Sequence, residues 1–155
     1  MVLDGGVADI SRTRTIAAPP QAIWDVLADF GSLSSWAARA DHSCILNQGP
    51  DGGAIDTTRR VQVGRNTVVE RIIEFEPPSA IAYAITGLPK QFRHVVNRWT
   101  LASSGSATEV TLTSRLEFGS TPVARAAGWV VCRGMAKQSD SLLAALANRM
   151  EHAHG

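Results

Sequence analysis

The C-terminal segment constrains the fold of this chain more than any other feature of the sequence. Between Pro122 and Glu151, the only helix-breaking residues are Gly128 and Gly134. Apolar and small residues recur here at alternating steps of three and four, which predicts one apolar stripe on a single long helix. At 1.5 Å per residue, a helix of roughly thirty residues would be about 45 Å long. The stripe consists of Trp129, Cys132, Ala136, Ser139, Leu143, Leu146 and Met150.

This long helix needs another apolar surface to lie against. Charged residues interrupt the segment, so we do not expect it to span a membrane. They are Arg125, Arg133, Lys137, Asp140 and Arg149. The candidate partner surface is one face of a sheet formed by the residues upstream.

Six upstream segments have strand composition and are separated by turn residues. They are His42–Asn47, Ala54–Val63, Asn66–Phe75, Ala80–Thr86, Phe92–Ala102 and Thr108–Phe118. Short connections, such as Gly64-Arg65, predict a succession of antiparallel hairpins.

The N-terminal part adds one strand and two short helices. Alternation from Asp9 to Ala17 predicts the strand, and Pro19-Pro20 ends it and opens a helix. Gly31 should end that helix, and a second short helix is expected over Ser32–Ala38, carrying Trp36. The predicted class is α+β, with about seven antiparallel strands curved around the long helix.

The length and the net charge of the chain limit its domain number and the classes of partner it can bind. A chain of 155 residues fits one domain, which we expect to cover 1–155 with an ordered core of about 8–151. The net charge of +1 argues against a nucleic-acid or anionic-membrane surface. Two cysteines are too few for a disulfide framework. No signal-peptide pattern is visible in Met1–Ile10, so a cytoplasmic location is expected.

We expect neither a metal site nor a cofactor. The four histidines, His42, His94, His152 and His154, are scattered, and no Cys/His cluster has metal-ligand spacing. The sequence also contains no phosphate-binding Gly-Lys-Ser/Thr loop and no Gly-x-Ser-x-Gly elbow.

The order of these elements resembles the START-like, Bet v 1-like helix-grip proteins (SRPBCC), and within them the polyketide cyclase/dehydrase group. The matching motifs are Ala18-Pro-Pro-x-x-Ile-Trp24-Asp-Val-Leu27, Trp36, the segment from Val68 to Pro78, Ala82-Tyr83, Gly87-Leu-Pro89 and the terminal helix. The resemblance implies a cavity between sheet and helix that takes hydrophobic ligands. Cyclases, dehydratases, lipid carriers and hormone receptors share this fold, so the fold does not fix the function.

Charge patterning selects the register of one hairpin. A two-residue turn at Gly64-Arg65 places Arg59 opposite Glu70, a favourable cross-strand pair. Shifting the turn by one residue would place Arg60 opposite Arg71, which is unfavourable. The first register is therefore predicted.

Periodicity leaves open which face of this hairpin is buried. Val69, Ile73 and Phe75 are apolar on the face opposite Glu70. The family resemblance favours Glu70 pointing inward, with a bulge before Phe75. Arg59 and Glu70 would then form an ion pair in the cavity wall, and the ligand should carry a polar group near it.

Alternation in the later strands points further polar side chains inward. The resemblance places Trp36 at the cavity mouth, and the helix stripe adds Trp129, Cys132 and Ser139. A mostly apolar wall with a few polar groups is typical of a small-molecule site. The predicted ligand-binding residues are Trp36, Arg59, Glu70, Tyr83, Asn97, Trp99, Ser114, Trp129, Cys132 and Ser139.

Two functions follow from this cavity. The first is a carrier or sensor that binds a small hydrophobic molecule, aromatic, lipid or polyketide-like. The alternative is a polyketide cyclase, aromatase or dehydratase, with Glu70 and Tyr83 as catalytic candidates and Asn97 assisting. The expected pairing of Glu70 with Arg59 favours binding, because a catalytic acid or base should be free of such a partner. A role through protein contacts also stays open, as do the monomer and the homodimer.

Overall fold

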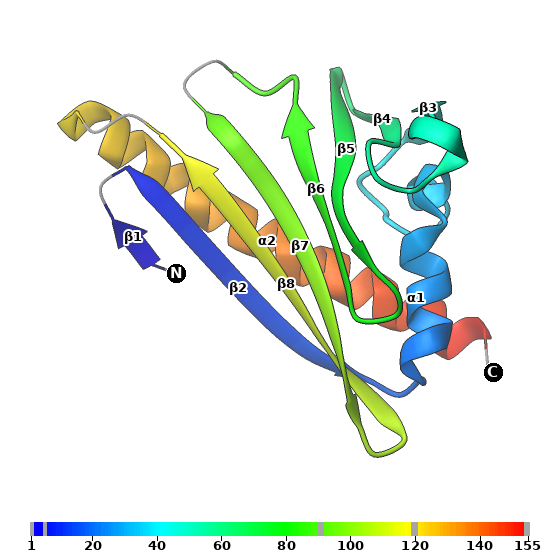
Figure 1. The fold of residues 1–155 in the computed structure, drawn as a ribbon. Helices are drawn as coiled ribbons and strands as arrows, with labels where there is room; N and C mark the ends of the chain where they lie inside the picture. Colours follow the sequence, from blue (N-terminus) through cyan, green and yellow to red (C-terminus); the bar gives the residue numbers. More distant parts are fainter. Residues whose placement is uncertain (1, 5, 90–91, 119–120, 154–155) are drawn as a thin grey trace.

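The structure is a computed structural model that describes residues 2–4, 6–89, 92–118 and 121–153. Eight strands, two α-helices and two short 3-10 helices make up these residues (Figure 1). In chain order they are β1 (Val2–Asp4), β2 (Val7–Ile16), α1 (Pro20–Ala28), η1 (Phe30–Ser35), β3 (His42–Asn47), η2 (Pro50–Gly52), β4 (Thr58–Val63), β5 (Asn66–Glu76), β6 (Ala80–Thr86), β7 (Arg93–Ser104), β8 (Ala107–Glu117) and α2 (Pro122–Ala153).

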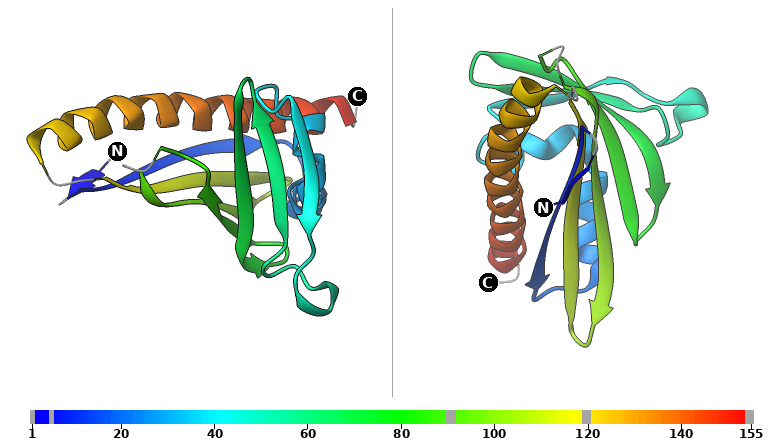
Figure 2. Two further views of the ribbon diagram at one scale, coloured as in Figure 1. Left: turned by 90° about the horizontal axis from the view of Figure 1, so that it is seen from above. Right: turned by 90° about the vertical axis from the view of Figure 1, so that its left-hand side faces the viewer.

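The strands form one antiparallel sheet in the order β1-β2-β8-β7-β6-β5-β4-β3. Figure 2 shows β3, β4 and β5 turned strongly away from the direction of β2 and β8, so the sheet bends around the space beside α2. The seven predicted strands and the α+β helix-grip architecture are confirmed. The short strand β1, which pairs with β2, is an eighth strand that the sequence did not predict.

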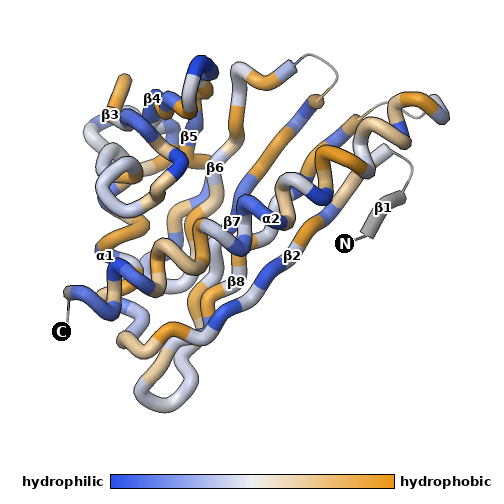
Figure 3. Tube along the Cα trace, turned by 180° about the vertical axis from the view of Figure 1, so that it is seen from behind, coloured by the Kyte–Doolittle hydropathy of each residue, from blue (hydrophilic) through white to orange (hydrophobic). Residues whose placement is uncertain are grey.

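The long helix packs against β2 and β8, as its apolar stripe predicts. Along α2, hydrophobic and hydrophilic residues alternate in short stretches, which is typical of a helix with one buried side (Figure 3). Within the described residues, no helix is both long and apolar enough to span a bilayer. The buried stripe residues are Cys132, Ala136, Ser139, Leu143, Leu146 and Met150.

The stripe does not begin at Trp129, as the sequence predicted. Trp129 is 45% exposed, and the guanidinium of Arg133 lies 4.9 Å from its ring centroid. Gly128 is the buried residue instead, because the ring of Phe118 lies where a side chain at 128 would start. A Cβ at Gly128 would approach that ring to 2.7 Å, so a larger residue here would force the ring of Phe118 to shift.

The second predicted helix is a 3-10 helix that ends before Trp36. It starts at Phe30, because Asp29 leaves the helical region with φ −74° and ψ 71°. Ser43 fixes this segment to β3: its hydroxyl accepts from the backbone N–H of Ser34 at 2.9 Å and donates to the carbonyl of Gly31 at 2.7 Å. Trp36 therefore follows the helix as its C-terminal cap.

Strand β4 begins only at Thr58, whereas the sequence predicted a start at Ala54. The preceding turn places Asp56 in the left-handed region, with φ 68°. The hydroxyl of Thr57 donates to the carbonyl of Gly53 at 2.9 Å and accepts from the N–H of Gly49 at 3.0 Å. These bonds hold the segment as a loop.

Candidate ligand-binding cavity

A cavity of about 460 Å³ lies between the concave face of the sheet and α2. Strands β4 to β8, the segment after η1, the β6–β7 loop and the middle of α2 all contribute to its wall. Most lining residues are apolar, among them Leu33, Val68, Ile85, Phe92, Val131 and Leu142. Such a wall is typical of a small-molecule site.

The predicted register of the β4–β5 hairpin is confirmed, because Arg59 pairs with Glu70 across the two strands. The predicted bulge is also present, as a register shift between Ile72 and Glu74. Both charged side chains face the interior: Arg59 is 3% exposed and Glu70 is 6% exposed. The alternation within β5 thus places its one buried charge beside the cavity.

The two side chains form a tight ion pair. Nε and Nη2 of Arg59 both lie 2.7 Å from Oε1 of Glu70. Nη1 of Arg59 donates to the carbonyl oxygen of Phe30 at 2.9 Å, which fixes the third side of the guanidinium. The desolvation cost of burying these charges is offset by this set of charge-assisted hydrogen bonds.

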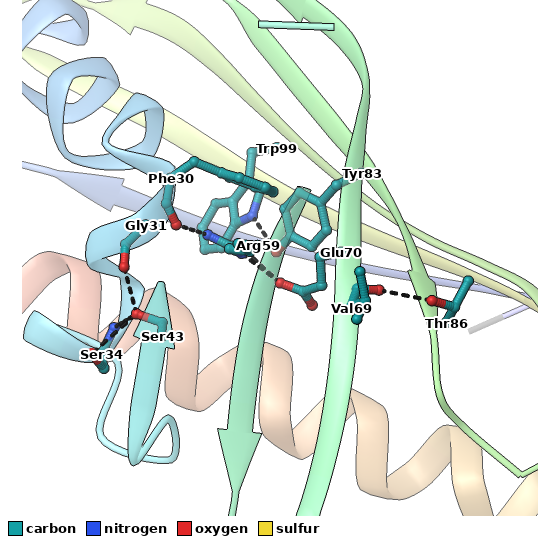
Figure 4. A network of polar contacts seen from close by, with 10 residues as sticks. All are labelled: Phe30, Gly31, Ser34, Ser43, Arg59, Val69, Glu70, Tyr83, Thr86 and Trp99. Atoms are coloured by element: carbon teal, nitrogen blue, oxygen red, sulfur yellow. Dashed lines mark hydrogen bonds and ion pairs between the residues drawn. The ribbon is translucent and has the colours of Figure 1, made fainter. Parts of the chain in front are cut away.

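Two aromatic rings enclose the guanidinium of Arg59. Its central carbon lies 3.8 Å from the ring centroid of Phe30 and 4.7 Å from that of Tyr83. Cation–π contacts of this kind strengthen when the cation is removed from water. Figure 4 shows Arg59 held between these rings and Glu70. The sequence did not predict the role of Phe30, because the residue is distant along the chain.

Glu70 presents one carboxylate oxygen to the cavity. Its contacts with Arg59 all end on Oε1, and in Figure 4 the other oxygen points away from Arg59. Because Glu70 also lines the cavity, this second oxygen is a hydrogen-bond acceptor available to a ligand hydroxyl or amine.

Tyr83 is the second polar group of the wall. Its hydroxyl oxygen accepts a hydrogen bond from Nε1 of Trp99 at 3.2 Å. Burial raises the pKa of Tyr83, and the negative charge of Glu70 raises it further. The charge of Arg59 and hydrogen bonds from Trp99 and Asn97 oppose this shift. The phenol therefore stays protonated near neutral pH and can donate a hydrogen bond.

Alkaline titration provides a test of this environment, because Tyr83 is the only tyrosine in the chain. Its raised pKa means that the folded state favours the protonated phenol. The contribution of Tyr83 to the free energy of unfolding is fully present below the pKa that tyrosine has in the unfolded chain. It is lost as the pH rises through the pKa of Tyr83 in the folded protein. We expect phenolate absorbance to appear above the ordinary tyrosine pKa, together with loss of circular dichroism. Ionisation near the ordinary pKa with the fold intact would contradict the buried position.

The structure brings five predicted site residues to the cavity: Glu70, Tyr83, Asn97, Ser114 and Ser139. Asn97 and Ser114 face each other across β7 and β8, and the Ser114 hydroxyl donates to Oδ1 of Asn97 at 2.6 Å. This bond orients the Asn97 amide so that its NH₂ group is left as the donor.

Three other predicted residues do not line this cavity. Trp36, Arg59 and Trp99 line a separate space of about 10 Å³, together with Tyr83. Trp36 and Trp99 pack edge to face with their ring centroids 6.1 Å apart. A space of this size holds about one water molecule. The structure therefore places these residues behind the cavity wall.

Trp129 and Cys132 line neither space. Cys132 is fully buried between α2 and the sheet, next to Ala8 and Ile10 of β2. Burial raises the pKa of its thiol. Cys132 is therefore a packing residue, and Trp129 lies outside on the helix.

Sequence reasoning missed part of the lining. Most of the wall formed by α2 is a second row of residues, one position before the buried stripe. This row consists of Val131, Met135, Gln138 and Leu142. Its helical spacing is visible in the sequence, but only the position of the sheet decides which row is buried. Arg39 and Leu88, from two loops, and Asn66, at the start of β5, were also missed.

Comparisons with known proteins agree with this fold. The family described as polyketide cyclase/dehydrase and lipid transport matches residues 7–151. The chain belongs to this family. Comparison with curated proteins finds no relative that matches the chain.

Solved structures share the fold at low sequence identity. A START superfamily protein from Mycobacterium smegmatis is 19% identical, with a TM-score of 0.77 over 94% of this chain and 98% of that one. The Zhui aromatase/cyclase from Streptomyces sp. R1128 is 21% identical, with a TM-score of 0.71 over 96% and 99%. A protein from Thermus thermophilus, TTHA0849, is 20% identical, with a TM-score of 0.76 over 96% and 100%.

Proposed function

We propose that this protein binds one small, largely apolar molecule in the cavity, as a carrier or sensor. The observation that carries the proposal is the cavity of about 460 Å³ with its mostly apolar wall. Ligand pockets typically measure about 300–1,000 Å³ and carry a few polar groups that orient the ligand. Here those groups are Glu70, Tyr83, Asn97, Ser114 and Ser139.

The state of the polar groups supports binding over catalysis. Glu70 is held by Arg59 through two short contacts, so proton transfer to its carboxylate would disturb a buried ion pair. Tyr83 is a protonated phenol and therefore a donor, not a base. These groups can orient a ligand through hydrogen bonds without chemical change.

The alternative function is a cyclase, aromatase or dehydratase. Two observations favour it: a solved aromatase/cyclase shares the fold, and Glu70 and Tyr83 both line the cavity. Under this alternative, Glu70→Gln should abolish turnover of a polyketone substrate. An unchanged rate in that variant would exclude Glu70 from the chemistry.

A neutral fluorescent probe tests the binding proposal directly. N-phenyl-1-naphthylamine is apolar and fluoresces more strongly in an apolar site. We expect saturable binding of one probe per chain, with displacement by unlabelled apolar aromatics. Fluorescence that rises without saturation, or not at all, would overturn the proposal.

A substitution at Gly134 tests the stability of α2 separately from ligand binding in the cavity. It lies within α2 and lines the cavity, and an added Cβ would meet no atom within 4 Å. Glycine in a helix interior costs about 1 kcal/mol relative to alanine. We therefore expect Gly134→Ala to raise the free energy of unfolding in urea by up to about 1 kcal/mol and to leave probe affinity unchanged. A less stable variant would show that this space is not open.

A further inference from the structure

The charges around the cavity are unevenly distributed. Of the residues that line it, Glu70 and Arg39 are charged. Glu70 is buried and paired with Arg59, so its charge is compensated. Arg39 is exposed, and the ion pairs found among the described residues do not include it. The uncompensated charge of the lining is therefore positive.

Arg39 lies at the rim of the cavity, which we define as its exposed lining residues. The rim consists of Arg39, Val63, Asn66, Leu88, Pro89, Gly134 and Gln138. An acidic residue follows shortly after Arg39 in the chain, but the carboxylate of Asp41 accepts a hydrogen bond from the N–H of Gly64 at 2.7 Å. The guanidinium of Arg39 can therefore bind a ligand. The side-chain amides of Asn66 and Gln138 lie on the same rim.

This distribution discriminates between kinds of ligand. An anionic group placed deep in the apolar cavity would lose its hydrating water. No unpaired cation of the lining would compensate for that loss there. At the rim, the same group stays partly hydrated and can receive charge-assisted hydrogen bonds from Arg39. A cationic group at the rim would meet like charge instead.

We propose that the cavity selects amphiphiles with a single anionic group, whose apolar body is enclosed while the anion is bound at the rim by Arg39. This inference rests on the proposed function, because it needs the cavity to take a ligand. A polar group at the enclosed end would meet Glu70 and Tyr83, so a hydroxylated aromatic or aliphatic acid fits best. We propose a free acid and not an anionic lipid at a membrane surface. A chain of net charge +1 is not expected to carry the basic patch that binds such a surface.

Two probes with the same aromatic skeleton test this proposal. 1-Anilinonaphthalene-8-sulfonate carries one anionic group, and N-phenyl-1-naphthylamine lacks it. We expect Arg39→Gln to weaken binding of the sulfonate by about fivefold and to change binding of the neutral probe by less than about twofold. Added salt should weaken sulfonate binding to the wild type more than to this variant.

Arg65→Gln is the matched control. It removes the same charge from an exposed position in the β4–β5 turn, next to Asn66 but outside the lining. We expect it to leave both probe affinities within about twofold. An equal loss of sulfonate binding in both variants would indicate a general charge effect and overturn the assignment to Arg39. Equal weakening of both probes by Arg39→Gln would also overturn it.

Two further outcomes are distinguishable. If the neutral probe fails to bind the wild type, the proposed function fails and the inference fails with it. If the neutral probe binds and the sulfonate shows no dependence on Arg39, the inference alone is wrong.

Vesicles of phosphatidylcholine, with and without phosphatidylglycerol, distinguish binding of a free acid from binding to a lipid surface. Vesicle binding that requires Arg39 and is not displaced by the sulfonate would overturn the proposal.

Discussion

Replacing Arg59 with methionine should lower the free energy of unfolding by about 3–5 kcal/mol. The substitution leaves the buried Glu70 without its partner, and it removes the cation from between the rings of Phe30 and Tyr83. A buried charge without compensation is among the most destabilising changes a single substitution can make. Urea denaturation followed by circular dichroism measures the loss.

Two variants control this experiment. Arg59→Met combined with Glu70→Leu removes both charges, so most of the lost stability should return. Arg71→Met removes the exposed ion pair, at 2.8 Å, between β5 and Asp56 in the turn before β4, and should cost no more than about 1 kcal/mol. Additive losses in the double variant would contradict the account, because they would mean that the two residues do not act as a pair.

Replacing Gly134 with phenylalanine should weaken probe binding by at least about tenfold. Gly134 lines the cavity at its exposed rim and no atom lies within 4 Å of an added Cβ, so a ring at this position has room to turn into the cavity mouth and compete with the ligand for volume. The helix itself tolerates the change, because phenylalanine has a higher helix propensity than glycine. Titration with N-phenyl-1-naphthylamine measures the affinity, and circular dichroism checks that the fold is intact.

Ala126→Phe is the matched control for this variant. It adds the same ring to an exposed position of α2 that does not line the cavity. Probe affinity should therefore stay within about twofold of the wild type. If Gly134→Phe bound the probe as well as Ala126→Phe does, the probe would occupy some other site.

Local patterns in the sequence predicted most of the fold and one part of the site. Charge pairing across a hairpin predicted the register that joins Arg59 to Glu70, because shifting the turn to the next residue would place Arg60 opposite Arg71. Strand alternation likewise predicted that Tyr83 and Ser114 face inward, and both are buried. Such predictions succeed where neighbouring residues alone determine the geometry.

Contacts between distant segments could not be predicted in the same way. Phe30 supplies both a carbonyl and a ring to Arg59, although the two residues lie in different elements. The burial of Gly128 in place of Trp129 depends on the ring of Phe118, which packs from the end of the sheet. The rim residue Arg39 comes from a loop whose path has no periodicity. These features follow from the tertiary arrangement, which local patterns do not contain.

Native mass spectrometry tests most directly whether the cavity holds a small molecule. The wild type and the Gly134→Phe variant are each incubated with N-phenyl-1-naphthylamine and transferred intact. The account predicts a complex of one probe per chain in the wild type and the free protein in the variant. Equal adducts in both proteins, or no adduct in either, would contradict the claim that a ligand occupies the space between the sheet and α2.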